Sequence, residues 1–127
     1  MDVISSHIAV WFEIPSTDFE RALTFYKNIL DVEIVVMDEN GLKQGLLPHT
    51  DQSLVSGSIV HGLDYKPSTE GCVVYLNGGH DLAVVLERVI AQGGSIHMPK
   101  THLGDDIGYI AQFIDTEGNR IGIHSVQ

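Results

Sequence analysis

The sequence predicts an α+β fold in which one strand-and-helix module is used twice. Residues 8–30 contain an alternating apolar strand, a Pro/Ser/Thr turn and an amphipathic helix. Residues 72–94 contain another strand, a Gly-rich turn and a second amphipathic helix, and short strands and turns follow each helix. This internal repeat indicates two like modules that pack together, with a cleft where they meet. We expect function to reside in that cleft.

Length and composition predict a single domain. The chain has 127 residues, of which 43% are hydrophobic, so the whole can bury a core that each half alone would form only marginally. We therefore expect one domain over residues 1–127, with module one at residues 6–62 and module two at residues 70–126.

The net charge and the cysteine content limit which partners and which cell compartment we expect. Seventeen acidic and seven basic residues give a net charge of −10. Nucleic acid is not an expected partner, because phosphate binding depends on Lys and Arg. The single Cys72 forms no intrachain disulfide, and no apolar run approaches the ~20 residues of a membrane helix. We expect a cytoplasmic protein that has no membrane contact.

The first strand has two distinct faces. Ile8, Val10, Phe12 and Ile14 alternate with Ala9, Trp11 and Glu13. We expect the first set to face the helices and the second set, with its carboxylate, to face the cavity.

The first helix and the strands after it follow from local signals. Residues 19–30 carry an apolar stripe, and the N-terminus offers either a Thr17–Glu20 capping box or Asp18 as the N-cap. Strands are expected at 33–37 and 42–47, with Asn40-Gly41 as a hairpin turn, and a fourth strand at 56–61.

The second module repeats this order. Cys72, Val74 and Leu76 alternate with Val73, Tyr75 and Asn77, and we expect the first set to face the helices, which makes Cys72 a buried thiol. A helix capped near Asp81 ends at Gly93-Gly94. Strands are expected at 95–98, 109–114 and 120–124, and residues 101–106 are expected to form a mobile loop.

Several segments resemble one family. Residues 18–26, Asp-Phe-Glu-Arg-Ala-Leu-Thr-Phe-Tyr, resemble the D-x-x-R-A-x-x-F-Y helix of the vicinal oxygen chelate superfamily, which includes glyoxalases, bleomycin-resistance proteins and extradiol dioxygenases. Residues 91–94 and 115–122 resemble its second helix end and its D-P-x-G-N turn. Residues 11–15, 98–100 and 121–125 are similar to a bacterial branch related to lactoylglutathione lyase. The resemblance implies two βαβββ modules that form a U-shaped mixed sheet around a cavity, in a homodimer.

The metal site that the resemblance implies is not expected here. Members of the family hold a divalent metal through side chains of the first and last strands of each module. The corresponding positions in this chain are Ala9, Val73 or Val74, and Gly122, and their side chains cannot coordinate a metal. Only the position near His61 keeps a group that can bind one. No cofactor is therefore predicted.

Six polar or aromatic residues are the candidate site residues. Strand parity places Glu13, His61 and His124 on the cavity face, where they form either an acid/base or metal-binding group or merely satisfy hydrogen bonds. Trp11, Tyr75 and Asn77 are the candidate ligand-binding residues, with ordinary wall residues as the alternative.

Three hypotheses on function follow. The first is a protein that binds a small polar or aromatic metabolite in the cavity of its sheet without the standard metal. The second is a divergent metal-dependent lyase, isomerase or dioxygenase that uses Glu13, His61 and His124. The third is an interaction or regulatory domain that has lost ligand binding. Unpaired sheet edges and the apolar residues Val3, Ile4 and Val126 favour a symmetric homodimer in each case.

Overall fold

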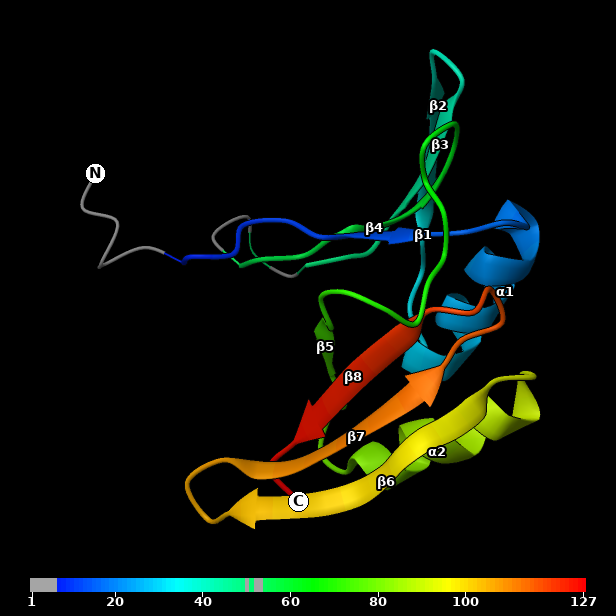
Figure 1. The fold of residues 1–127 in the computed structure, drawn as a ribbon. Helices are drawn as coiled ribbons and strands as arrows, with labels where there is room; N and C mark the ends of the chain where they lie inside the picture. The colour runs from blue at the N-terminus through cyan, green and yellow to red at the C-terminus, as the bar shows by residue number, and fades with distance from the viewer. Residues whose placement is uncertain (1–6, 50, 52–53) are drawn as a thin grey trace.

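The chain forms two strand-and-helix modules, each with its own four-stranded sheet (Figure 1). The computed structural model describes residues 7–49, 51 and 54–127. The elements in chain order are β1 (Glu13–Pro15), α1 (Phe19–Leu30), β2 (Val35–Glu39), β3 (Leu42–Leu46), β4 (Ser58–His61), β5 (Tyr75–Asn77), α2 (Leu82–Ala91), β6 (Ser95–Gly104), β7 (Gly108–Ile114) and β8 (Arg120–Ser125).

The two sheets have the same topology. The first has the strand order β1-β4-β3-β2 and the second has the order β5-β8-β7-β6. In each sheet the first strand pairs parallel with the last strand of its module, and the other pairs are antiparallel. The duplication and the α+β class predicted from the sequence are confirmed, and β1 and β5 are both left as edge strands.

Local signals in the sequence define the turns and the helix ends. Asn40 and Gly41 have φ values of 55° and 81°, as a two-residue hairpin turn with both central residues left-handed requires. Asp18 is the N-cap of α1 and accepts a hydrogen bond from Arg21 N, which decides between the two caps considered above. Asp81 caps α2 in the same way, and Gly93 follows the last turn with a φ of 95°.

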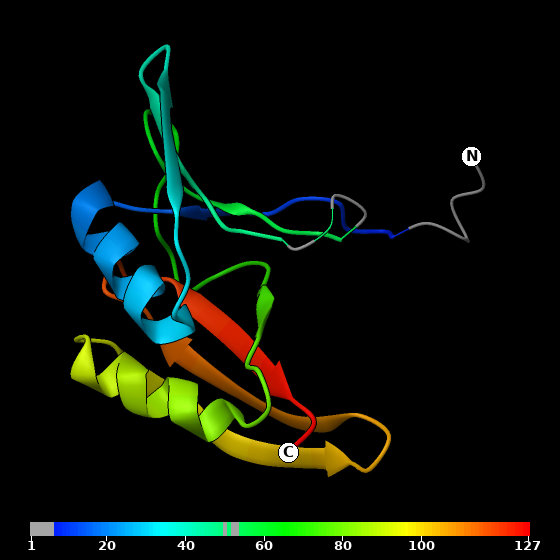
Figure 2. The ribbon, with the colours of Figure 1, turned by 180° about the vertical axis from the view of Figure 1, so that it is seen from behind.

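The two modules pack through their helices. α1 and α2 lie side by side in both views of the ribbon (Figures 1 and 2). Phe25 of α1 reaches Phe113 of β7, with ring centroids 6.0 Å apart. One core cluster therefore combines residues of both modules, including Ile14 and Ile59 from the first sheet and Leu76 from the second.

The N-terminal segment differs from its prediction. Only Glu13–Pro15 forms a strand, and Ile8 and Val10 are 89% and 71% exposed instead of facing the helices. Residues 7–12 extend beyond the sheet, as Figure 1 shows, so the helices do not cover them. Phe12 and Ile14 do pack in or against the core, so the expected parity holds only where the chain reaches the helices.

Two expectations for the second module are wrong. Residues 101–104 belong to β6 and are not a loop, because irregular pairing between Met98 and Thr101 accommodates Pro99 and the edge strand continues to Gly104. Cys72 is exposed, because β5 begins only at Tyr75 and the residues before it lie outside the sheet.

Val3 and Ile4, expected to support a dimer, lie outside the described residues, and Val126 is 68% exposed. Among the described residues, no helix is long and apolar enough to cross a membrane.

Candidate functional site

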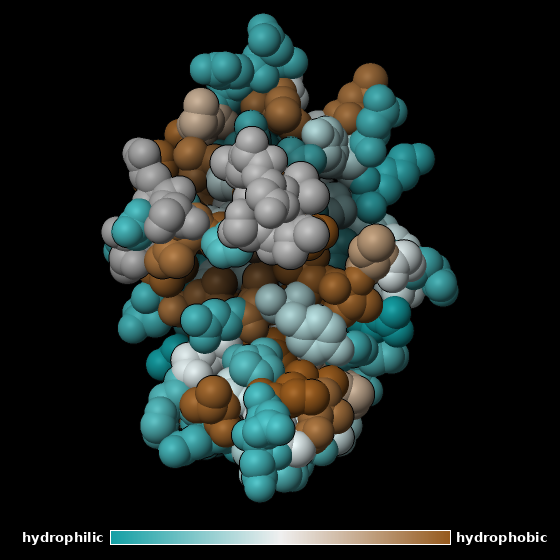
Figure 3. Space-filling model, turned by 90° about the vertical axis from the view of Figure 1, so that its left-hand side faces the viewer, coloured by the Kyte–Doolittle hydropathy of each residue, from teal (hydrophilic) through white to brown (hydrophobic). Residues whose placement is uncertain are grey.

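A cleft of about 1110 Å³ lies between the two modules. The first module contributes the segments before β1, after α1 and between β3 and β4, and the second contributes β5, the turn after it and α2. Hydrophobic side chains gather in a hollow across this face of the molecule (Figure 3). The sequence predicted a cleft where the modules meet, and the structure contains one there.

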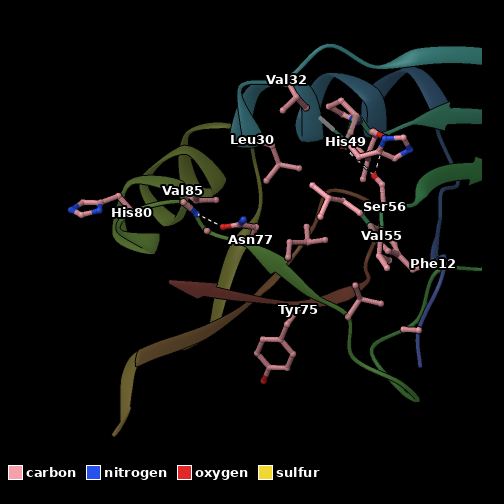
Figure 4. Close-up of a pocket in the computed structure, with 18 of the residues that line it drawn as sticks. Phe12, Leu30, Val32, His49, Val55, Ser56, Tyr75, Asn77, His80 and Val85 are labelled. Atoms are coloured by element: carbon pink, nitrogen blue, oxygen red, sulfur yellow. Dashed lines mark hydrogen bonds between the residues drawn. The ribbon is translucent and has the colours of Figure 1, made fainter. Parts of the chain in front are cut away.

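The walls of the cleft are mainly aliphatic. In the close-up view, Leu30 of α1 and Val32 just after it lie between Val85 on one side and Val55 on the other (Figure 4). Phe12 forms part of the wall near β1 and packs against the core. Such a surface favours an apolar ligand body, and the few polar groups at its edge would fix the ligand's orientation.

The three residues predicted to contact a ligand all line this cleft. Trp11 is 44% exposed, which leaves much of its indole free to contact a ligand. The side-chain oxygen of Asn77 accepts a hydrogen bond from the backbone N of Gly79 at 2.9 Å, so this amide also shapes the turn after β5. The ring of Tyr75 points away from the middle of the cleft in Figure 4.

Tyr75 covers the outer face of the second sheet at Gly122. The two residues are register partners of β5 and β8, and a Cβ added to Gly122 would come within 2.5 Å of the Tyr75 ring. Gln112 Nε2 donates a hydrogen bond to Tyr75 Oη at 2.8 Å. The position where the family resemblance implies a metal-binding glutamate is therefore occupied by an aromatic ring packed on a glycine.

The residues of the second candidate group, Glu13, His61 and His124, have separate surroundings. His61 Nδ1 lies 2.9 Å from the carbonyl oxygen of Ser16, and its imidazole ring lies beside the Phe19 ring of α1 at 6.5 Å between centroids. His124 Nε2 lies 2.5 Å from the carbonyl oxygen of Ile107. The two imidazoles lie on strands of different sheets, β4 and β8, and each contacts the carbonyl oxygen of a residue outside the strands.

Glu13 is exposed and contacts Tyr65, which lies in the segment between β4 and β5. The pKa of Tyr65 is raised, mainly by the negative charge of Glu13 and to a lesser extent by burial and by the hydrogen bond that the phenol donates to Glu13. None of the described residues forms a group of three or more His, Cys, Asp or Glu side chains that could hold a metal ion. The donor set of the family's metal centre therefore does not fit the residues present here.

Two of the segments that carry the family resemblance, residues 18–26 and 115–122, contact each other where the two modules join. Glu117, in the turn between β7 and β8, accepts hydrogen bonds from the backbone N–H groups of Thr17 and Asp18 at 2.9 and 2.7 Å. Its other oxygen accepts one from Arg21 Nε at 2.7 Å. With its side chain only 1% exposed, Glu117 caps the start of α1 from the other module.

Asp115 and Tyr26 continue this contact inside the core. The buried Tyr26 hydroxyl donates to Asp115 Oδ2 at 2.6 Å. Burial is the main cause that raises the pKa of this phenol well above its usual value, and the nearby Asp115 charge is the second. Asn119 Nδ2 donates to Asp115 Oδ2 and to the carbonyl oxygen of Pro15 at 3.0 and 2.7 Å. These motif residues hold the modules together and lie outside the cleft lining, a role that sequence patterns alone did not reveal.

Arg88 is a cleft residue that the sequence analysis did not single out. It lies in α2 one helical turn after Val85, and its Nη1 donates to the carbonyl oxygen of Ile29 at 3.3 Å. The signal available in the sequence was its place at the margin of the apolar stripe of α2.

The chain belongs to the family described as the Glyoxalase/Bleomycin resistance protein/Dioxygenase superfamily, which matches residues 6–123. No curated protein matches the chain significantly.

Solved structures of this fold are similar to the chain. A glyoxalase I mutant (V278E) from Zea mays is 17% identical with a TM-score of 0.69, covering 92% of this chain and 45% of its own. The chain thus spans about half the length of the maize protein. A glyoxalase/bleomycin resistance protein from Albidiferax ferrireducens T118 is 18% identical with a TM-score of 0.64, covering 94% and 98%. An antibiotic binding protein from Streptomyces sp. CB03234 is 18% identical with a TM-score of 0.62, covering 95% and 97%.

These identities show the fold and no more. They do not connect the chain to the branch related to lactoylglutathione lyase, so only membership of the superfamily is established.

Proposed function

We propose that the chain binds a small, largely apolar or aromatic molecule in the cleft between its modules, without the family's metal centre. The observation that carries this proposal is the cleft itself, which is lined by both modules and includes Trp11, Tyr75 and Asn77. Its volume of about 1110 Å³ exceeds what a metabolite of ordinary size needs. The name of the Streptomyces protein of the same fold, an antibiotic binding protein, is consistent with binding as a function of this fold.

The alternative of a metal-dependent lyase, isomerase or dioxygenase has less support. It requires Glu13, His61 and His124 to converge, whereas each has its own partner in a different part of the described fold. Gly122, covered by Tyr75, leaves no room for a carboxylate unless that ring moves. A relation to lactoylglutathione lyase would rest on the same residues, and it is not our preferred function.

We also propose that the chain forms a homodimer. β1 and β5 are edge strands, and exposed edges pair readily with another chain. Exposed apolar side chains at Ile8 and Val10 extend the β1 edge. We expect sedimentation velocity at micromolar concentration to give the mass of a dimer, whereas a monomer alone would contradict this assembly.

A matched pair of variants tests the binding proposal. The probe is N-phenyl-1-naphthylamine, an uncharged aromatic compound whose binding is followed by its fluorescence and by quenching of Trp11, the single tryptophan of the chain. Val55→Phe adds bulk inside the cleft, and Val36→Phe makes the same change at an exposed position of β2. We expect saturable binding to the wild type and to Val36→Phe, and at least about tenfold weaker binding to Val55→Phe.

Equal binding to all three proteins, or no saturable binding at all, would contradict a ligand site in the cleft. The third hypothesis, a regulatory domain without a small-molecule ligand, would then account better for the fold.

A further inference from the structure

Two charged side chains that line the cleft, Asp81 and Arg88, differ in how far other groups of the protein balance their charge. Among the described residues, the lining contains one carboxylate, Asp81, and one guanidinium, Arg88, together with the imidazoles of His49 and His80. Asp81 Oδ1 is already bound by Lys100 Nζ and by the backbone N of Ala83, each at 2.9 Å. The hydrogen bond from Lys100 and then the one from Ala83 lower the pKa of Asp81. Its charge is therefore balanced within the protein.

Arg88 is not balanced in this way. No ion pair among the described residues includes it. Within the part of the chain that the structure describes, its guanidinium makes one hydrogen bond, from Nη1 to the Ile29 carbonyl oxygen, and this uses one of five donors. That contact places the guanidinium beside the end of α1, next to Leu30 and Val32, which also line the cleft.

The surroundings make this cation a strong anchor. Arg88 is partly buried, and the neighbouring side chains of Leu30, Val32 and Val85 are apolar, so water screens its charge less than at an open surface. Guanidinium groups bind carboxylates and other oxyanions through two parallel hydrogen bonds. The chain as a whole has a net charge of −10, so an anion is attracted here by a local group and not by the general field of the protein.

We infer that the ligand of the cleft is an apolar, preferably aromatic, molecule that carries an anionic group, with the anion bound by Arg88 and the apolar body along Leu30, Val32 and Val85. This inference rests on the proposed function and adds the chemical class of the ligand.

Two probes with the same ring system separate charge from apolar contact. 8-Anilinonaphthalene-1-sulfonate carries a sulfonate, and N-phenyl-1-naphthylamine lacks it. Arg88→Gln removes the charge but keeps an amide N–H that can donate to the Ile29 carbonyl. Lys43→Gln removes one positive charge from an exposed position of β3 outside the cleft and serves as the control.

The inference predicts a specific pattern of affinities. Wild type and Lys43→Gln are expected to bind the sulfonate more tightly than the uncharged probe, and the preference is expected to fall as salt concentration rises. Arg88→Gln is expected to lose about tenfold or more in affinity for the sulfonate, as for a lost hydrogen bond to a charged group, with little change for the uncharged probe.

The other outcomes contradict either the role of Arg88 or the proposed binding function. If the uncharged probe binds and Arg88→Gln leaves the sulfonate affinity unchanged, or weakens both probes equally, the role of Arg88 is wrong and the binding cleft stands. If neither probe binds the wild type, the proposed function itself is wrong. If binding appears only when the protein is diluted to monomer, a second copy of the chain is the occupant of the cleft, and the inference fails.

Discussion

Gly122 stands where the resemblance to the family implies a metal-binding glutamate, and its surroundings are those of an aromatic contact. Gly122 has no side chain, and the Tyr75 ring lies where its Cβ would be. The ring is held from its other end by the hydrogen bond from Gln112. Gly122 and Tyr75 are thus parts of one arrangement, in which an aromatic ring packs on a glycine.

A double-mutant cycle tests this arrangement. Gly122→Ala forces the Tyr75 ring to move and is expected to lower the free energy of unfolding by about 1–3 kcal/mol, the usual cost of overpacking. In a Tyr75→Ala background the same substitution meets no ring and is expected to cost clearly less. Urea denaturation of the four proteins measures the coupling. Equal costs in both backgrounds would mean that the ring does not rest on Gly122 in solution.

At the scale of elements, the turn between β7 and β8 stabilises the start of α1 across the junction of the modules. Burial raises the pKa of Glu117, but hydrogen bonds from Arg21, Asp18, Thr116 and Thr17 outweigh it, and the net pKa is lowered from the usual 4.5. A carboxyl group with a lowered pKa in the folded state stabilises that state at neutral pH. This contribution is lost as the pH falls below 4.5 through the folded-state pKa.

Glu117→Gln is therefore expected to have a pH-dependent effect. At neutral pH the variant loses charge-assisted hydrogen bonds to α1, and we expect a loss of about 1–3 kcal/mol in the free energy of unfolding. Well below pH 4.5 the wild-type carboxyl group is protonated too, so the difference between the proteins is expected to shrink. Glu87→Gln, at an exposed position of α2, is the control. Denaturation curves at both pH values decide, and a difference independent of pH would contradict this role of the charge.

The sequence predicted the elements whose causes are local. The cap at Asp81, the Asn40-Gly41 turn and the burial of Leu76 all follow from a few neighbouring residues, and Asp18 is one of the two caps that the sequence left open for α1. It did not predict that residues 8–10 leave the sheet, because their alternation is the same whether or not a helix covers them. Nor did it predict the contacts of Glu117 or the place of Arg88, because both depend on how the two modules pack. The roles of the six candidate site residues stay predictions.

At the scale of the whole molecule, packing through the helices determines where a ligand can bind. α1 contacts the core of the second module, and the cleft opens between the modules beside β5 and the segments around β1, on the face shown in Figure 3. The cleft therefore exists only because the modules are joined in this way. A ligand there would contact both modules and resist their separation.

Hydrogen–deuterium exchange with and without 8-anilinonaphthalene-1-sulfonate tests for a ligand site between the modules, because it locates the ligand on the chain. We expect slower exchange in both modules at once, in residues 54–57 and 73–79, with no change in the hairpin of β2 and β3. Protection confined to that hairpin, or to one module alone, would contradict a binding site between the modules.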